Sequence, residues 1–185
     1  MKKSDSKIND LLSFLDNSPT AWHAVSNCST TLINHGFTEL KEQDAWDLKP
    51  GGHYFVTRNG SSLCAFVVPS KSPTSAHIIA SHTDSPALKL KPNCEFRKEN
   101  MLMLSCEVYG APLLSSWLNR DLGIAGRVVY LDKKNIMRED LVRIDDSPLV
   151  IPQLAIHLDR NVNENGPILN KQDHLAALAS INDEK

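Results

Sequence analysis

The central feature of the sequence is the stretch Ile78-Ile79-Ala80-Ser81-His82-Thr83-Asp84-Ser85-Pro86. It is a short apolar run that ends in polar residues, and such a run predicts a buried strand. Open α/β sheets bind their ligands at the carboxyl ends of such strands. Because side chains two apart in an extended chain point the same way, His82 and Asp84 are predicted to project to one side and His77 to the other. The sequence therefore predicts a site at the edge of an α/β sheet.

Two interpretations of His82 and Asp84 follow from the residues alone. A neutral imidazole can bind zinc, and a nearby carboxylate can orient a catalytic group, so the pair favours metal-dependent hydrolysis. Alternatively, the His and the Asp close the strand and cap the following turn, while Pro86 prevents any further helix or ladder.

Two helices and a hairpin are predicted before this stretch. Apolar residues at helical spacing predict a first helix, and Pro19 and Gly36 mark the beginning and end of a second one. Aromatic and β-branched residues at 53–58 and 63–68 flank Asn59-Gly60, which is a strong signal for a tight turn. Helices followed by strands predict an α/β sheet that is covered on at least one side.

The sequence after Pro86 is predicted to form a second, β-rich unit. Residues 101–109 and 126–131 are predicted strands, and turn formers separate the strands at short intervals. Residues 154–158 are apolar except for His157, which predicts a strand histidine, and the spacing in 171–181 predicts a short helix. The resulting domain boundaries are 1–86 and 87–185.

Composition and charge are those of an ordinary globular protein. Of 185 residues, 41% are hydrophobic and 23% charged, and the net charge of −2 provides no large field for binding nucleic acid. The N-terminus lacks the unbroken apolar core of a signal peptide, and no apolar run is long enough to span a membrane. Four scattered cysteines without a C-x-x-C pair predict free thiols in the cytoplasm.

Longer motifs resemble the M18 family of metallo-aminopeptidases, the aspartyl aminopeptidases. Residues 82–92, HTDSPALKLKP, resemble the signature of that family. Four further stretches agree in the same order, namely DNSPTAWHAV at 16–25, YFVTRNGSS at 54–62, VYGAPLLSSWLNRDLG at 108–123 and IPQLAIHLDRNVNE at 151–164. The resemblance covers nearly the whole chain, and several long motifs in order are far more specific than one short motif.

This resemblance implies a fold and an activity. Residues 1–86 are expected to form the N-terminal portion of a zinc-peptidase α/β catalytic domain, and 87–185 part of a β-rich inserted dimerisation domain. A complete enzyme of this type uses two zinc ions to activate the water that removes an N-terminal residue, preferentially Asp or Glu, from a peptide. In this chain His82 would bind zinc, Asp84 would tune that site, and His157 would bind substrate in a neighbouring subunit.

The resemblance also implies an incomplete metal site. The remaining ligands and the general base of the family follow the insertion, and their motifs do not occur here; Asp145-Asp146 and Asp183-Glu184 are interpreted as solvated surface. The isolated chain is therefore expected to be inactive, and its expected partners are further copies of itself or a complementing C-terminal segment. The alternative is a non-enzymatic module that dimerises with a full-length M18 protein. A serine hydrolase is disfavoured, because no G-x-S-x-G motif surrounds Ser62 or Ser85.

Overall fold

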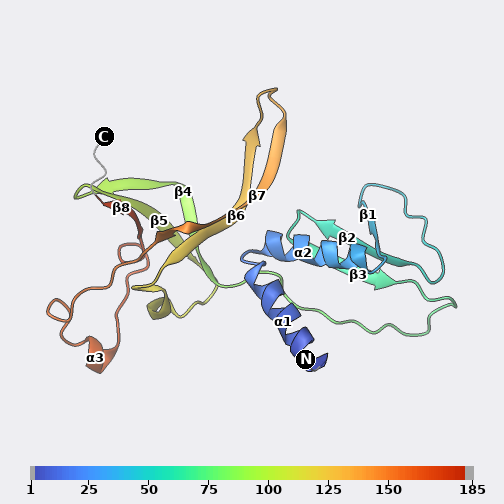
Figure 1. Ribbon diagram of the computed structural model, residues 1–185, viewed down its shortest axis with the longest axis horizontal. Helices are drawn as coiled ribbons and strands as arrows, with labels where there is room; N and C mark the ends of the chain where they lie inside the picture. Colours follow the sequence, from blue (N-terminus) through green and yellow to red (C-terminus); the bar gives the residue numbers. More distant parts are fainter. Residues whose placement is uncertain (1–2, 182–185) are drawn as a thin grey trace. The chain divides into compact units, whose positions relative to one another are not determined.

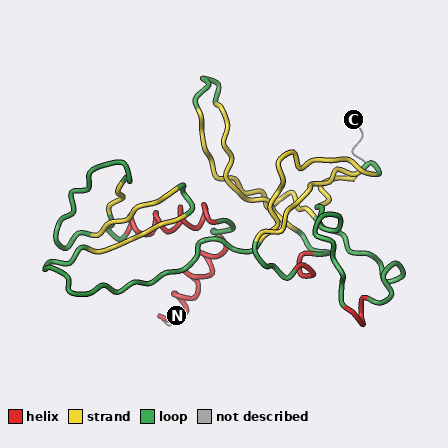
Figure 2. The backbone as a smooth tube through the Cα atoms, turned by 180° about the vertical axis from the view of Figure 1, so that it is seen from behind, coloured by secondary structure: helices red, strands yellow, loops and turns green. Residues whose placement is uncertain are grey.

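Residues 3–181 are described by a computed structural model, in which the chain forms two compact units. The first unit comprises the chain through Ser85 together with Ala125–Val142, and the second comprises Pro86–Ile124 and the chain from Arg143 onward. Figures 1 and 2 show the elements of each unit. In chain order they are α1 (Lys3–Asp16), α2 (Ala21–Asn34), β1 (Thr38–Leu40), β2 (His53–Arg58), β3 (Ser62–Val67), β4 (Ala87–Lys98), β5 (Met101–Tyr109), η1 (Leu114–Trp117), β6 (Leu122–Leu131), β7 (Met137–Leu149), α3 (Val162–Asn165) and β8 (Ala177–Ile181).

The helix α2 has a cap at each end. The Thr20 side chain accepts a hydrogen bond from the His23 backbone N–H at 3.4 Å, which satisfies one of the free donors of the first turn. Beyond the C-terminus of the helix, Gly36 takes a φ of +80°, a conformation that glycine adopts without steric cost. The predicted second helix and its end at Gly36 are confirmed.

The sheet of the first unit has the strand order β1-β2-β3, with β1 parallel to β2 and β2 antiparallel to β3. The predicted turn at Asn59-Gly60 is confirmed: their φ values are +52° and +61°, and the Ser61 N–H donates to the Arg58 carbonyl at 3.1 Å. Positive φ at both central residues is what a tight hairpin turn of the primed type requires. The helix α2 contacts this sheet, and Phe55 at the centre of β2 is fully buried.

The predicted strand at residues 78–82 is wrong. Residues 68–86, all of them described, contain no helix or strand, and the side chains of Ile78 and Ile79 are 86% and 100% exposed. An entirely apolar run suits a central strand with a neighbour on each edge, and none of the described strands pairs with it. The third strand of the sheet is β1 instead.

The second unit is built on the antiparallel sheet β4-β5-β8. The predicted strand at 101–109 is confirmed as β5, and the predicted strand at 126–131 lies within β6. The strands β6 and β7 form a long hairpin (Figure 1). Buried side chains form one hydrophobic cluster in this unit: Leu104, Cys106, Leu118, Leu149, Ile151, Leu175 and Ala177.

Two further predictions in the second unit are wrong. The predicted helix at 171–181 ends instead in the strand β8, because the backbone of Leu178 exchanges hydrogen bonds with Val150 at 2.7 and 3.2 Å while β8 also pairs with β5. The predicted strand at 154–158 is irregular, with a turn at residues 156–158 that places His157 at the surface. Partners distant in sequence decide the outcome for β8, and local spacing does not reveal such partners. The turn at residues 156–158 is closed locally, by a hydrogen bond from the Leu158 N–H to the Ala155 carbonyl.

The outer part of the β6–β7 hairpin, Ala125–Val142, belongs to the first unit. The predicted boundary at residue 86 instead assigned the whole hairpin to the second domain. Arg127 of the hairpin donates to Asn59 and lies 5.0 Å from the centre of the Trp22 ring. The predicted functional division into a catalytic and a dimerisation domain stays a prediction.

Of the helices described, none is long and apolar enough to cross a membrane. All four cysteines are free, with Cys106 buried and Cys64 exposed. Burial raises the pKa of the Cys106 thiol above its ordinary value, because the thiolate loses its hydration.

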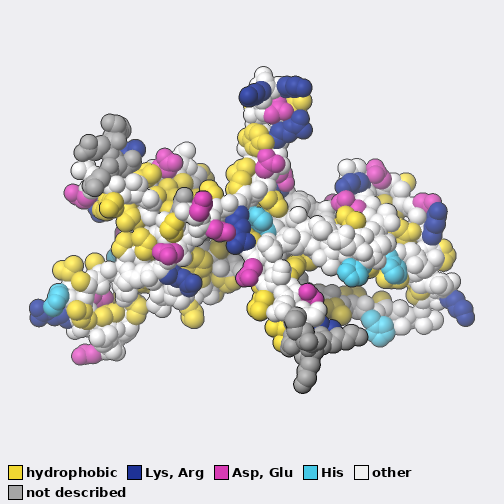
Figure 3. All heavy atoms as spheres, in the orientation of Figure 1, with side chains coloured by type: hydrophobic (Ala, Val, Ile, Leu, Met, Phe, Trp, Pro, Cys, Tyr) yellow, Lys and Arg dark blue, Asp and Glu magenta, His cyan; other side chains and the backbone are white. Residues whose placement is uncertain are grey.

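Exposed apolar side chains lie on both units (Figure 3). Four of them are at least half exposed on α1, namely Ile8, Leu11, Leu12 and Leu15.

The variant Phe55→Ala is expected to lower the free energy of unfolding by about 3–5 kcal/mol, because it removes a fully buried aromatic ring and leaves a cavity. Phe96→Ala is the matched control, because Phe96 is 38% exposed in β4 and its loss is expected to cost less than about half as much. Urea denaturation followed by tryptophan fluorescence measures both changes. Equal losses for the two variants would contradict the position of Phe55 in the core.

Candidate active site

The side chains of His82 and Asp84 lie together, although the strand from which their common direction was predicted is absent and the chain bends at Thr83. Nδ1 of His82 is 2.7 Å from the backbone oxygen of Asp84 and 3.2 Å from its Oδ1 atom. Because a carbonyl oxygen only accepts hydrogen bonds, Nδ1 carries the hydrogen and donates it. In the neutral ring, Nε2 then keeps its lone pair. The His82 side chain is 78% exposed, so this nitrogen belongs to a ring that a ligand can reach.

This arrangement fits zinc. Histidines that bind a metal through one ring nitrogen commonly donate the other ring N–H to a carbonyl or carboxylate oxygen, which fixes the tautomer and the direction of the ring. Asp84 supplies both kinds of acceptor to His82. Within residues 3–181, no three His, Cys, Asp or Glu side chains form a group that could hold a metal ion. His82 is the one ligand predicted, and its role and that of Asp84 stay predictions.

A contact that the sequence did not reveal holds this segment. The hydroxyl of Thr83, between His82 and Asp84, donates to the backbone carbonyl of Ser61 at 2.7 Å. Ser61 follows the turn between β2 and β3, 22 residues earlier in the chain. No sequence pattern signals a hydrogen bond from a side chain to so distant a backbone group.

His157 lies in the second unit, in the exposed turn formed by residues 156–158. The backbone N–H of Leu158 donates to the Ala155 carbonyl at 2.8 Å and closes that turn. An exposed histidine at a turn is available to a ligand or to another subunit. Its predicted contact with substrate stays a prediction.

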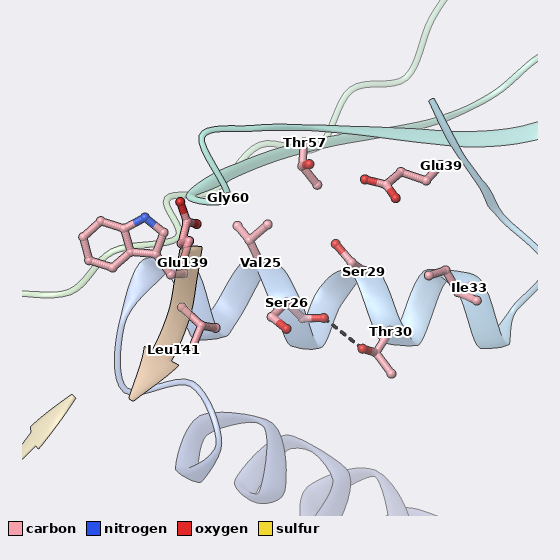
Figure 4. A pocket seen from close by; sticks show the side chains of 11 residues that line it. Val25, Ser26, Ser29, Thr30, Ile33, Glu39, Thr57, Gly60, Glu139 and Leu141 are labelled. Carbon is pink, nitrogen blue, oxygen red and sulfur yellow. Dashed lines mark hydrogen bonds between the residues drawn. The ribbon is translucent and has the colours of Figure 1, made fainter. Parts of the chain in front are cut away.

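A hollow of about 300 Å³ lies in the first unit between α2, the β2–β3 turn and β7 (Figure 4). Two carboxylates line it, Glu39 from β1 and Glu139 from β7. Each has a cationic partner, because Lys41 lies 3.0 Å from Glu39 and Arg127 lies 3.4 Å from Glu139. The other lining residues are Trp22, Val25, Ser26, Ser29, Thr30, Ile33, Thr57, Gly60 and Leu141. The hollow therefore offers hydroxyl groups and two carboxylates whose charges are balanced by ion pairs, rather than a second metal site.

Of the two acidic doublets, Asp145-Asp146 lies within the described residues. Asp145 pairs with Arg143 at 2.6 Å on the exposed surface, which agrees with its interpretation as solvated surface. Asp183 and Glu184 lie outside the described residues.

A second hollow, of about 310 Å³, lies in the second unit. His174 lines it, and Nδ1 of His174 accepts a hydrogen bond from the Asn170 backbone N–H at 3.1 Å.

Comparison with known proteins shows the family. Residues 14–185 match the family model of Peptidase_M18, described as "Aminopeptidase I zinc metalloprotease (M18)". A probable M18 family aminopeptidase 2 of Clostridium acetobutylicum is 44% identical over 94% of the chain, which spans 41% of that relative. A probable aspartyl aminopeptidase of Ricinus communis is 39% identical over 95% of the chain, which spans 38% of it. The chain belongs to the M18 family, as the motifs predicted.

Solved structures agree with this assignment. A cryo-EM structure of the Ape4 and Nbr1 complex matches with a TM-score of 0.88 and 38% identity, over 95% of this chain and 34% of that chain. The structure of the S. cerevesiae mApe1 dodecamer matches with a TM-score of 0.76 and 26% identity, over 96% and 48%. The predicted α/β fold, a partial M18 architecture with a β-rich second unit, is confirmed. The chain spans less than half the length of each of these relatives.

The tautomer of His82 is a direct test of the site geometry. At alkaline pH, where imidazoles are neutral, long-range ¹H–¹⁵N NMR spectra are expected to show the hydrogen of His82 on Nδ1, because Asp84 offers only acceptors there. His77, five residues earlier, provides the internal comparison. A hydrogen on Nε2 of His82 would contradict the arrangement on which metal binding depends.

Proposed function

We propose that this chain is part of a zinc-dependent aminopeptidase that removes N-terminal residues, preferentially Asp or Glu, from peptides. Membership of the M18 family supports the reaction class, and the name of the Ricinus communis relative supports the acidic preference. The observation that carries the proposal is the engagement of His82 Nδ1 by Asp84, which leaves Nε2 available for a metal ion.

Each of the three predicted site residues has a role in this proposal. His82 binds zinc through Nε2, and Asp84 holds the ring in that tautomer and raises its basicity as a ligand. His157 lies exposed in the turn at residues 156–158, and it contacts the substrate in the site of a neighbouring subunit. Two zinc ions, when bound, polarise the scissile carbonyl and make water a stronger nucleophile.

The complete site needs more residues than this chain provides. A site for two zinc ions needs about four to six His, Asp and Glu ligands, whereas His82 is the one ligand predicted in this chain and residues 3–181 hold no group of three such side chains. We therefore expect the 185 residues on their own to show no turnover. The similarity to a dodecameric enzyme supports assembly of the whole protein into a homo-oligomer, and the free cysteines support a cytoplasmic location.

The exposed apolar segments support the same view. Ile78 and Ile79 immediately precede the site and are almost entirely exposed, and the apolar residues of α1 are about half exposed. Such surfaces bind a partner or aggregate when they are left in water. In the proposed enzyme, the part that this chain does not span covers them and supplies the remaining ligands.

The test uses a chimera in which residues 14–185 replace the matching part of the Clostridium acetobutylicum relative. The chimera is expected to release aspartate from an N-terminal aspartyl peptide in a zinc-dependent reaction, and the isolated chain is expected to release none. His82→Ala is expected to lower kcat/KM at least about 100-fold and Asp84→Asn about 10–100-fold, because a metal ligand and its orienting partner are lost.

His77→Ala is the matched control, because it removes a histidine from the same segment and is expected to leave the rate within about twofold. A folded chimera that binds zinc but releases no amino acid would contradict the proposed reaction. Zinc-dependent turnover by the isolated chain would contradict the expected incompleteness. Tight binding of the isolated chain to a full-length M18 enzyme, with no gain of activity in the chimera, would favour the non-enzymatic module.

A further inference from the structure

The segment that carries His82 and Asp84 is not part of a strand or helix. Regular structure is absent from residues 68–86, all of which the structure describes, so no ladder of backbone hydrogen bonds fixes this segment. The His82 side chain is 78% exposed, and packing therefore contributes little to its position. Asp84 sets the direction of the His82 ring, but the backbone that carries both residues needs a support of its own in this chain.

Thr83 provides a support of that kind. Its hydroxyl donates to the Ser61 carbonyl at 2.7 Å, which is the usual distance for an O–H···O hydrogen bond. The Thr83 side chain is partly buried, whereas Ser81 and His82 before it are exposed. Thr83 therefore attaches the segment to the first unit between the two predicted site residues.

The turn that accepts this hydrogen bond is itself held from its other end. Nη1 of Arg127 donates to the backbone carbonyl of Asn59 at 3.1 Å and to Oδ1 of Asn59 at 3.0 Å. The Arg127 side chain is only 19% exposed, and its guanidinium lies 5.0 Å from the centre of the Trp22 ring on α2. A guanidinium at this distance from an aromatic ring is attracted to it.

Gly60 in this turn is restricted by its backbone conformation and lies near Trp22 of α2. The positive φ of Gly60 is strained for other residues, and a Cβ atom at this position would lie 3.6 Å from Cδ1 of Trp22. Figure 4 shows Gly60 and Glu139 at the same end of the hollow, and Glu139 lies 3.4 Å from Arg127. The turn at residues 59–61 is therefore supported by α2 and by the β6–β7 hairpin.

We propose that Thr83 is a positioning residue for His82, and that the turn at residues 59–61, held by Arg127, is the support on which it acts. This inference rests on the proposed function, because it assigns the support of the predicted metal ligand. In the complete enzyme, loss of the Thr83 hydroxyl leaves the ligands in place but lets the segment move, so it lowers kcat and leaves KM unchanged.

The first experiment measures motion in the 185-residue chain, without metal or activity. Thr83→Val removes the hydroxyl at nearly constant volume and is expected to lower the ¹H–¹⁵N heteronuclear NOE of residues 82–84. Thr83→Ser keeps the hydroxyl and is expected to restore the native values. Thr31→Val is the matched control, because Thr31 donates to the Asn27 carbonyl at 2.9 Å within α2 and its loss is expected to leave residues 82–84 unchanged.

The second experiment measures peptide hydrolysis by the chimera. Thr83→Val is expected to lower kcat about tenfold with KM within about twofold, and Thr83→Ser is expected to recover most of the rate. Arg127→Gln tests the support: it is expected to lower the NOE of residues 82–84, and adding Thr83→Val to it is expected to cost less than in the native background.

The outcomes separate this inference from the proposed function. An active chimera in which Thr83→Val changes neither the NOE nor kcat would overturn the role of Thr83 and leave the proposed function intact. A chimera without activity would overturn the proposed function, and the NOE values would then decide alone whether Thr83 holds the segment. A fall in thermal stability with unchanged motion of residues 82–84 would show a purely structural role and overturn the inference.

Discussion

The tight turn at Asn59-Gly60 is the constraint on which the first unit depends. Two consecutive residues with positive φ reverse the chain there and set the register in which Phe55 lies opposite Ala65. The same reversal presents the carbonyl oxygens of the turn to other parts of the chain. The Asn59 carbonyl accepts a hydrogen bond from Arg127 on β6, and the Ser61 carbonyl accepts one from the Thr83 hydroxyl, next to the predicted metal ligand His82. One local conformation therefore aligns the sheet, holds the hairpin and supports the candidate site.

Local signals in the sequence predicted the elements whose cause is local. Asn59-Gly60 predicted the turn because few other residues adopt its backbone conformation, and Gly36 predicted the end of α2 for the same reason. The strand at 78–82 and the helix at 171–181 were predicted wrongly because distant partners decide both. The apolar run before His82 has no described strand beside it, whereas the segment that contains Leu178 has partners in both β5 and Val150. Composition and spacing do not show which edges of a sheet are available.

The candidate site shows the same distinction at the level of side chains. The alternation of an extended chain predicted that His82 and Asp84 point to the same side, but the strand is absent and a bend at Thr83 brings the two residues together instead. The sequence did not show that the backbone oxygen of Asp84 is the nearer acceptor, nor that Thr83 reaches Ser61. Arg127 was assigned to the second domain, yet its contacts are with Asn59 and Trp22 of the first unit. A division of the chain by sequence order cannot anticipate a hairpin that packs with a different unit.

The geometry of the segment has a consequence for how a metal site of this kind is assembled. A ligand that is free to rotate loses that freedom when the metal binds, and the loss weakens binding. In His82 the tautomer and ring direction are already set by Asp84, and Thr83 ties the backbone between them to a supported turn. Zinc catalysis also needs a cavity that excludes bulk water from the metal. His82 does not lie in such a cavity here, because 78% of its side-chain surface is exposed. In the proposed enzyme, the contribution of these residues is therefore a preset ligand, and the dry cavity and remaining ligands come from the part that this chain does not span.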